Sequence, residues 1–187
     1  MRRRELAVVG AVLVVVAACG SSPPSSPPAA TTPSSADRYG APVVASPRDI
    51  SAYATSPCAL LAPSERSQLS LSGSGRQRTS IDVQECSWPT TEDGELAMAV
   101  DADRDLLADT YRTRLTPVFV PTNIVGLPAV RQRRALDDNT CTVTTGVGPT
   151  QALETEWSGP MAKQTSDPCA RAEEAIALVI RKLPPQK

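Results

Sequence analysis

Residues 140–157, which read TCTVTTGVGPTQALETEW, decide the fold because two alternating segments flank one turn. In the first segment every second residue from Cys141 to Val147 shares a face, and in the second Leu153, Thr155 and Trp157 are aligned. Strict alternation is typical of a strand with one buried face, and Gly148-Pro149 favours a turn. The pattern predicts two strands, at 140–147 and 151–157.

The clearest helix signal follows these strands. Ser166 or Asp167 is the expected cap, Pro168 lies in the first turn, and Pro184-Pro185 ends the helix. The apolar residues between these ends recur at helical spacing, which predicts an amphipathic helix with one buried stripe. That stripe is Ala172, Ile176, Val179, Ile180 and Leu183.

Upstream patterns complete a mixed fold. Strands are expected at 80–88, 95–101 and 129–135, and helices at 57–61, from Pro63 and at 103–115. In the first strand, Cys86 and Trp88 have the opposite parity to Val83, so a bulge near Gln84-Glu85 is expected to turn them inward. The helix capped by Asp103 is expected to bury Leu107, Tyr111 and Leu115. Strands grouped between helices favour an α+β fold: a single domain with an antiparallel sheet and helices packed on it.

Four cysteines lie in this domain, and an even number in a small exported domain is typical of a disulfide framework. Cys58 and Cys86 are as far apart in the chain as Cys141 and Cys169, which favours these two local pairs. The nested alternative joins Cys58 with Cys169 and Cys86 with Cys141. A zinc site is not expected, because no C-x-x-C pair is present.

The fifth cysteine, Cys19, ends a leader. Three arginines at 2–4 precede an uncharged apolar run at 6–18, and small residues lead into the cysteine. This order is typical of a secretory signal peptide. The cysteine after Val16-Ala17-Ala18 resembles the lipobox of bacterial lipoproteins, which implies cleavage after residue 18 and a diacylglyceryl group on Cys19. Lipid attached there would hold the protein on the outer face of the cytoplasmic membrane.

A tether is expected between the lipid and the domain. Residues 20–36 carry no charge and nothing larger than Thr or Pro, so they bury too little apolar surface to order. Their prolines favour extended, semi-rigid stretches. We therefore predict a leader at 1–18, the lipidated cysteine and a disordered tether at 19–47, and the α+β domain at 48–187.

Several function classes are disfavoured by composition. The chain has no histidine, which excludes a Ser-His-Asp or Cys-His catalytic group and a histidine-ligated metal. The formal net charge of -1 argues against a nucleic-acid partner. Asp101, Asp103 and Asp105 imitate the start of a calcium loop, but Leu106 and Arg112 stand where an EF-hand needs Gly and Glu. No metal, no cofactor and no catalytic residue is expected.

A set of motifs in this order resembles a known family. The motifs are Pro57-Cys58-Ala59-Leu60-Leu61 with Glu65, Cys86-Ser87-Trp88, Gly126-Leu127-Pro128-Ala129, Cys141, and Asp167-Pro168-Cys169-Ala170-x-Ala172. Together they resemble the actinobacterial lipoproteins grouped as domain of unknown function 3558, over about residues 50–184. Members often have Asp where this chain has Ser56. The resemblance implies an exported, membrane-anchored α+β domain with disulfides, and it implies no established activity.

Two surfaces remain as candidates for a function. Arg131, Arg133 and Arg134 form a small basic cluster, which is expected to be an exposed strand face. The alternative is a surface that meets an anionic envelope polymer or lipid headgroups. Trp88 and Trp157 are expected in the core beside the cysteines, with a cleft lined by them as the alternative. We expect a non-enzymatic envelope lipoprotein that binds a protein, polymer or small ligand outside the membrane. The alternatives are a hydrolase that uses paired carboxylates and a purely structural component. The carboxylates available to a hydrolase are Asp82, Glu85, Glu154 and Glu156.

Overall fold

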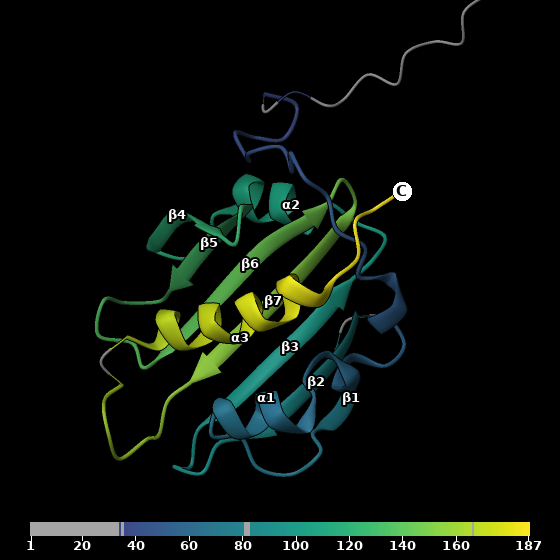
Figure 1. Cartoon of the computed structure of the whole chain (residues 1–187). Coiled ribbons are helices and arrows are strands. Elements are labelled where there is room, and N and C mark those ends of the chain that lie inside the picture. Colours follow the sequence, from purple (N-terminus) through teal and green to yellow (C-terminus); the bar gives the residue numbers. More distant parts are fainter. Residues whose placement is uncertain (1–33, 35, 81–82, 166) are drawn as a thin grey trace, which may run out of the picture. The chain divides into compact units, whose positions relative to one another are not determined.

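The computed structural model describes residues 34, 36–80, 83–165 and 167–187 (Figure 1). Seven strands form one antiparallel sheet in the order β1-β2-β3-β7-β6-β5-β4. The strands are β1 (Arg76–Ser80), β2 (Val83–Pro89), β3 (Glu95–Asp101), β4 (Val118–Ile124), β5 (Leu127–Arg133), β6 (Thr140–Gly148) and β7 (Gln151–Ser158). The helices are η1 (Ser51–Tyr53), η2 (Pro57–Leu60), α1 (Pro63–Gln68), α2 (Leu106–Thr113) and α3 (Pro168–Lys182). The predicted α+β class with an antiparallel sheet is confirmed.

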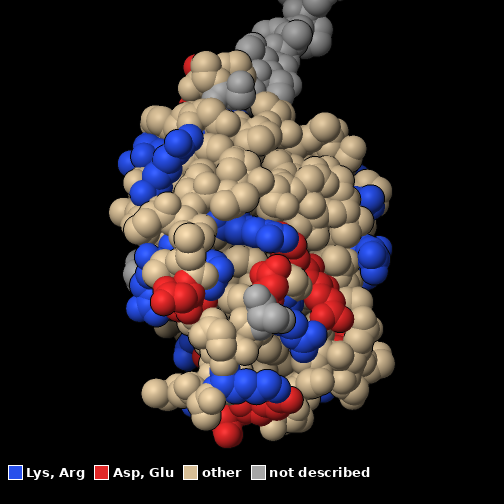
Figure 2. Space-filling model, turned by 90° about the vertical axis from the view of Figure 1, so that its left-hand side faces the viewer, with Lys and Arg blue, Asp and Glu red and all other residues tan. Residues whose placement is uncertain are grey.

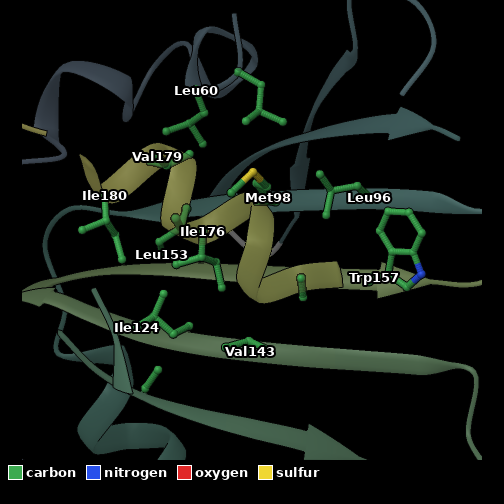
Figure 3. Packing of buried hydrophobic residues seen from close by; sticks show 14 of the residues in the cluster. Leu60, Leu96, Met98, Ile124, Val143, Leu153, Trp157, Ile176, Val179 and Ile180 are labelled. Atoms are coloured by element: carbon green, nitrogen blue, oxygen red, sulfur yellow. The ribbon is translucent and has the colours of Figure 1, made fainter. Parts of the chain in front are cut away.

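Helix α3 covers one face of the sheet and encloses the main core. It begins as expected, since the Asp167 carboxylate accepts a hydrogen bond from the Ala170 N–H at 3.0 Å. Its apolar stripe packs on the inward side chains of β3, β6 and β7 (Figure 3). The whole predicted stripe is buried, together with Leu96, Met98, Val143 and Leu153 from the strands.

Helix α2 lies on the other face, at one end. It packs Leu107 and Tyr111 against Val130 of β5. Beyond α2, the antiparallel register brings polar and small side chains of β2, β3, β6 and β7 to the same side. We call this surface the open face, and it carries Glu85, Ala97, Ala99, Thr142, Thr144, Glu154 and Glu156.

The prediction of a single strand at 80–88 is wrong. Two strands, β1 and β2, share this range and pair as antiparallel neighbours, with Ser80 opposite Val83. Pairing of β2 with β3 is continuous from Gln84 to Pro89, and the expected bulge is absent from that ladder. Cys86 and Trp88 point inward from β2 without it. Ile81, which was expected on the same strand, lies outside the described residues.

The segment at 103–124 also differs from prediction. Asp105, not Asp103, caps α2, accepting a hydrogen bond from the Ala108 N–H at 3.1 Å. The helix ends at Arg114, which takes a left-handed conformation (φ 41°), so Leu115 lies beyond it and is 83% exposed. Strand β4 was not expected. It contains Pro121, which a strand tolerates at the edge of a sheet.

Part of the segment predicted as tether, up to residue 47, is packed against the domain. Arg38 is only 6% exposed and forms a two-pronged ion pair with Asp105, at 2.7 and 2.8 Å. Ala41 and Val44 are buried against the sheet and α2. Residues 36–47 therefore belong to the folded domain, whereas the leader and residues 19–33 lie outside the described residues.

In the part of the chain that the structure describes, no helix is long and apolar enough to cross a membrane.

Candidate functional site

Two disulfides each connect a helix to a strand. Cys58 of η2 is bonded to Cys86 of β2, and Cys169 of α3 is bonded to Cys141 of β6. These are the two local pairs, each with a sequence separation of 28 and a Cα–Cα distance of 5.0 Å. Bonded sulfurs are not free to ligate zinc. One covalent link holds η2 against β2, the strand that carries Trp88. The other holds α3 against β6, where Cys141 is opposite Trp157 of β7.

The two tryptophans lie in one row across the core face. Trp88 of β2 is opposite Leu96 of β3, and Leu96 is opposite Trp157 of β7. Trp88 is fully buried, and its indole N–H donates to the Ser74 carbonyl at 3.3 Å. Trp88 is therefore a core residue, and the alternative in which it lines a binding cleft is wrong. Gly75 closes this side, because a Cβ there would overlap the Trp88 indole nitrogen.

Trp157 is buried differently. It is 5% exposed, yet its indole nitrogen has no hydrogen-bond partner among the described residues. In Figure 3 this nitrogen lies on the side of the ring away from the labelled core residues. The Arg171 guanidinium stacks over the ring, 4.9 Å from its centroid. A buried N–H without a partner costs about 1–3 kcal/mol. The nitrogen itself has less than 1 Å² of accessible surface, so a molecule that touches this residue from outside meets ring carbon.

A hollow of about 400 Å³ adjoins Trp157. We call it the Trp157 hollow. It lies between the β2–β3 turn, the β7–α3 loop and the first turns of α3. Its wall includes Ser70, Thr91, Glu92, Pro160, Lys163 and Arg171. Lys163 Nζ lies 3.4 Å from the Glu92 carboxylate, and this ion pair joins the turn to the loop. A second hollow of about 360 Å³ shares Glu92, Pro160 and Lys163 with the first. The two hollows together suit a small ligand.

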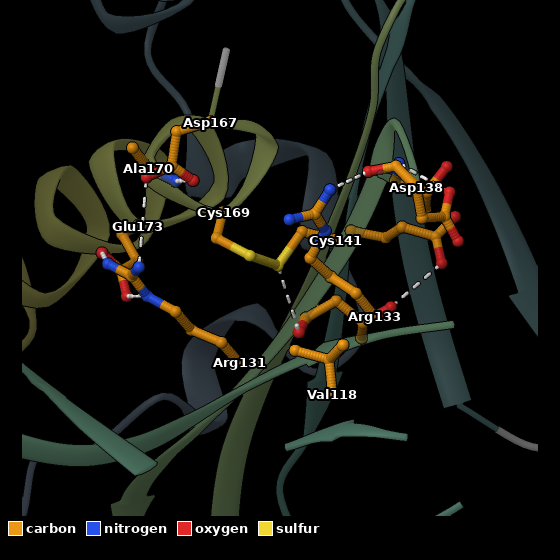
Figure 4. Close-up of a disulfide and its surroundings, with 12 residues drawn as sticks. Val118, Arg131, Arg133, Asp138, Cys141, Asp167, Cys169, Ala170 and Glu173 are labelled. Atoms are coloured by element: carbon orange, nitrogen blue, oxygen red, sulfur yellow. Dashed lines mark hydrogen bonds and ion pairs between the residues drawn. A yellow bond between two sulfur atoms is a disulfide. The ribbon is translucent and has the colours of Figure 1, made fainter. Parts of the chain in front are cut away.

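The predicted basic cluster is divided by the fold. Arg131 forms a two-pronged ion pair with Glu173 of α3, at 2.6 and 2.5 Å (Figure 4). This carboxylate raises the pKa of Arg131, so its charge is engaged within the domain. Arg133 donates to the Asp138 carbonyl, and Arg134 forms an ion pair with the Asp138 carboxylate at 2.9 Å. Basic and acidic side chains alternate over the lower half of the surface in Figure 2, with no large patch of one sign in that view.

The predicted carboxylates gather on the open face. The Thr144 hydroxyl donates to Glu154 and the Thr142 hydroxyl to Glu156, both at 3.2 Å. Burial raises the pKa of the Glu154 carboxyl, and the nearby carboxylates of Glu156 and Glu85 add to this. Glu85 is paired with Arg78 at 2.6 Å. Asp82 lies outside the described residues.

Two of the three aspartates that imitate a calcium loop, Asp101 and Asp105, have partners within the domain. Asp101 accepts hydrogen bonds from the N–H groups of Asp103 and Arg104 and pairs with the Arg104 side chain. Asp105 caps α2 and binds Arg38. No group of three or more potential metal ligands occurs within the described ranges.

The most important residues of the Trp157 hollow were not identified from sequence. Arg171, Lys163 and Glu92 meet Trp157 only through the fold, and no motif connects them. Trp157 was named as a candidate, but its N–H state depends on contacts that the sequence does not reveal. Cys19, the predicted lipidation site, lies outside the described residues.

Fold and site together define a small α+β domain with two disulfides and a ligand-sized hollow at one end of its sheet. The chain belongs to the family described as "Protein of unknown function (DUF3558)", whose model matches residues 14–182. No curated protein and no solved structure matches the chain.

Proposed function

We propose that the protein is a lipid-anchored lipoprotein outside the cytoplasmic membrane, whose domain binds a component of the cell envelope. The leader and the lipobox pattern before Cys19 support the anchor. The two disulfides support export, because such bonds form and persist in oxidising compartments.

One observation carries the binding role: the Trp157 hollow of about 400 Å³, in which the Trp157 ring meets charged side chains from three separate elements. Glu92 comes from the β2–β3 turn, Lys163 from the β7–α3 loop and Arg171 from α3. An aromatic wall combined with a few polar groups is typical of a site for a small ligand.

The position of the hollow suits an anchored binding module. Residues 38–44 dock beside α2, where Arg38 meets Asp105, and this is the segment that continues back toward Cys19. Trp157 lies at the opposite end of β7, where it pairs with Leu96 near the start of β3. An eight-residue strand is about 26 Å long. Residues 38–44 and the Trp157 hollow therefore lie at opposite ends of β7.

Two experiments test the proposal. Cys19→Ala should move the protein from the membrane fraction to the soluble fraction, and unchanged fractionation would contradict lipid anchoring. For the binding role, a photoreactive amino acid replaces Thr91, which lines the hollow, or Leu136, which is 80% exposed elsewhere. Irradiation of cells should give a covalent adduct of defined mass from position 91 and none from position 136. No adduct from position 91 would favour a purely structural role.

A second candidate function rests on Glu154. Its raised pKa favours the protonated form that a general acid needs, and Glu156 lies two residues along the same strand face. Residues so placed have Cα atoms about 7 Å apart, so their carboxyl groups lie on the same face of the strand. Paired carboxyl groups are the catalytic groups of most glycosidases. Turnover of an envelope glycan by the wild type, lost in Glu154→Gln, would establish this function. Turnover retained in that variant would exclude Glu154 as its acid.

A further inference from the structure

We infer that the end of the domain next to the anchor rests on the lipid membrane through three exposed hydrophobic side chains, Tyr39, Val43 and Val125. This inference rests on the lipid anchor of the proposed function and adds an orientation of the domain to it. Three features support it: the place where the chain enters the domain, the side chains exposed there, and the backbone conformation of two of them.

The chain enters the domain at one end of the sheet, which we call the entry end. Residues 38–44 lie beside α2 at this end (Figure 1), and Val44 packs next to Gly146 near the end of β6. Residues 20–33 separate Cys19 from the described chain, and fully extended they would span about 50 Å. Lipid on Cys19 would therefore hold the entry end at a high effective concentration beside the membrane.

Hydrophobic side chains are exposed at this end. Tyr39, which is 56% exposed, and Val43 belong to the entering segment. Val125, which is 46% exposed, lies in the two-residue turn between β4 and β5. This turn is at the entry end as well, because β5 is antiparallel to β6 and begins where β6 finishes. Tyrosine is enriched at membrane–water interfaces, where its ring meets apolar groups and its hydroxyl meets water.

The backbone at two of these positions is unfavourable for the residues that occupy it. Tyr39 and Val125 take the left-handed conformation, with φ 57° and 51°, and each is followed by a glycine with positive φ. Asn-Gly is the usual pair in such turns, because bulky and β-branched residues are strained there. The other three described non-glycine residues with positive φ are polar, namely Ser70, Asp93 and Arg114. Strain of this kind is typically retained for function.

Charge does not draw the entry end to anionic headgroups. Arg112 lies over the Tyr39 ring, 5.8 Å from its centroid, but it is paired with Asp109 at 3.0 Å. Asp37 adds a negative charge two positions before Tyr39. The contact therefore depends on insertion of the hydrophobic side chains between headgroups, and it should not depend on lipid charge. A few small side chains bind a membrane weakly, so the contact needs the anchor as well.

The experiment measures which end of the anchored protein touches lipid. The lipidated protein is placed in phosphatidylcholine vesicles whose acyl chains carry bromine, which quenches tryptophan fluorescence on contact. Tyr39→Trp puts a tryptophan at the entry end, and Leu136→Trp puts one in the exposed β5–β6 turn at the other end. Wild type supplies the background from Trp88 and Trp157. Quenching of the added tryptophan should be several-fold stronger at position 39 than at position 136, and high salt should not change it.

A second variant tests the strained turn. Val125→Asn keeps the turn, because asparagine tolerates the left-handed conformation, so thermal stability should be unchanged or higher. Combined with Tyr39→Trp, it should weaken quenching at position 39, because a polar side chain replaces a hydrophobic one at the contact. Unchanged quenching would overturn the assignment of Val125 to the membrane contact.

The remaining outcomes separate the orientation from the anchor. Equal quenching at positions 39 and 136 would overturn the orientation. Quenching that high salt abolishes would overturn the hydrophobic contact. Absence of quenching at position 39, with fractionation that still depends on Cys19, would overturn the inference and leave the anchor of the proposed function intact. The exposed side chains of the entry end would then be assigned to a protein partner.

Discussion

The two tryptophans occupy equivalent places in the fold and have different surroundings. Each lies on the core face of the sheet, next to Leu96 in the row and next to a disulfide. The N–H of Trp88 is bonded within the protein, whereas the N–H of Trp157 has no partner in the described structure. Burial of an aromatic ring therefore serves the core at both positions, whereas Trp157 also borders a hollow.

The largest expected effect comes from the disulfides beside the tryptophans. Each closes a loop of the same length, so replacing either pair by alanine should lower the free energy of unfolding by about 3–4 kcal/mol. Urea unfolding of both variants measures this. Equal losses would show that the disulfides do not cause the different surroundings of Trp88 and Trp157. A loss in only one variant would show that the two disulfides do not stabilise the fold equally.

The second test concerns how tightly Trp88 is enclosed. Gly75 has φ +90°, and a Cβ there would overlap the Trp88 indole nitrogen and lie 2.5 Å from Cys86 Sγ. Gly75→Ala should destabilise the protein by about 3 kcal/mol, from backbone strain together with overpacking. Gly73→Ala is the matched control, because φ is +72° and nothing lies within 4 Å of the added Cβ. Similar losses for the two variants would show that Trp88 has free space around it.

The third test replaces each tryptophan by phenylalanine, which keeps a ring and removes the N–H. Trp88→Phe should lower the free energy of unfolding by about 2 kcal/mol, since it loses a hydrogen bond and leaves a cavity. Trp157→Phe should lower it by less than about 1 kcal/mol, because the donor it loses is unpaired. Thermal or urea unfolding measures both losses. A loss for Trp157→Phe equal to or larger than that for Trp88→Phe would contradict the difference between the two surroundings.

The smallest effect belongs to the rival site on the open face. Folding raises the pKa of Glu154 above its ordinary value of 4.5, so the folded state holds this proton more tightly than the unfolded state does. The resulting stabilisation is present at low pH and is lost as the pH rises above that value. Glu154→Gln should therefore gain stability relative to wild type between about pH 4 and pH 7. A constant difference across this range would show that the Glu154 carboxyl titrates normally.

Local patterns were sufficient for the elements whose signals lie within one segment. Strand β3 matches its predicted bounds, β6 and β7 extend one residue further, and α3 begins at the Asp167 cap. Alternation and helical spacing identify these elements because each has one buried and one exposed side. The equal separations of the cysteines likewise favoured the observed pairs over the nested ones.

Features that depend on distant residues could not be predicted in the same way. Residues 36–47 were assigned to the tether, yet they are ordered by Arg38, whose partner Asp105 lies 67 positions later. Strand β4 was not predicted, because the alternation of apolar and polar residues typical of a strand is interrupted at Pro121, Thr122 and Asn123. The Trp157 hollow combines the β2–β3 turn, the β7–α3 loop and α3, so only the folded chain brings its residues together.

The central claim is that Trp157, not Trp88 or the open face, is where the domain meets its ligand. The most direct measurement is the indole N–H spectrum of the ¹⁵N-tryptophan-labelled protein with and without the low-mass fraction of its own envelope. The account predicts that the Trp157 signal moves and the Trp88 signal does not, and that Trp157→Phe abolishes retention of the ligand. An unmoved Trp157 signal, with backbone shifts confined to β2, β3 and β7 around Glu154, would contradict it.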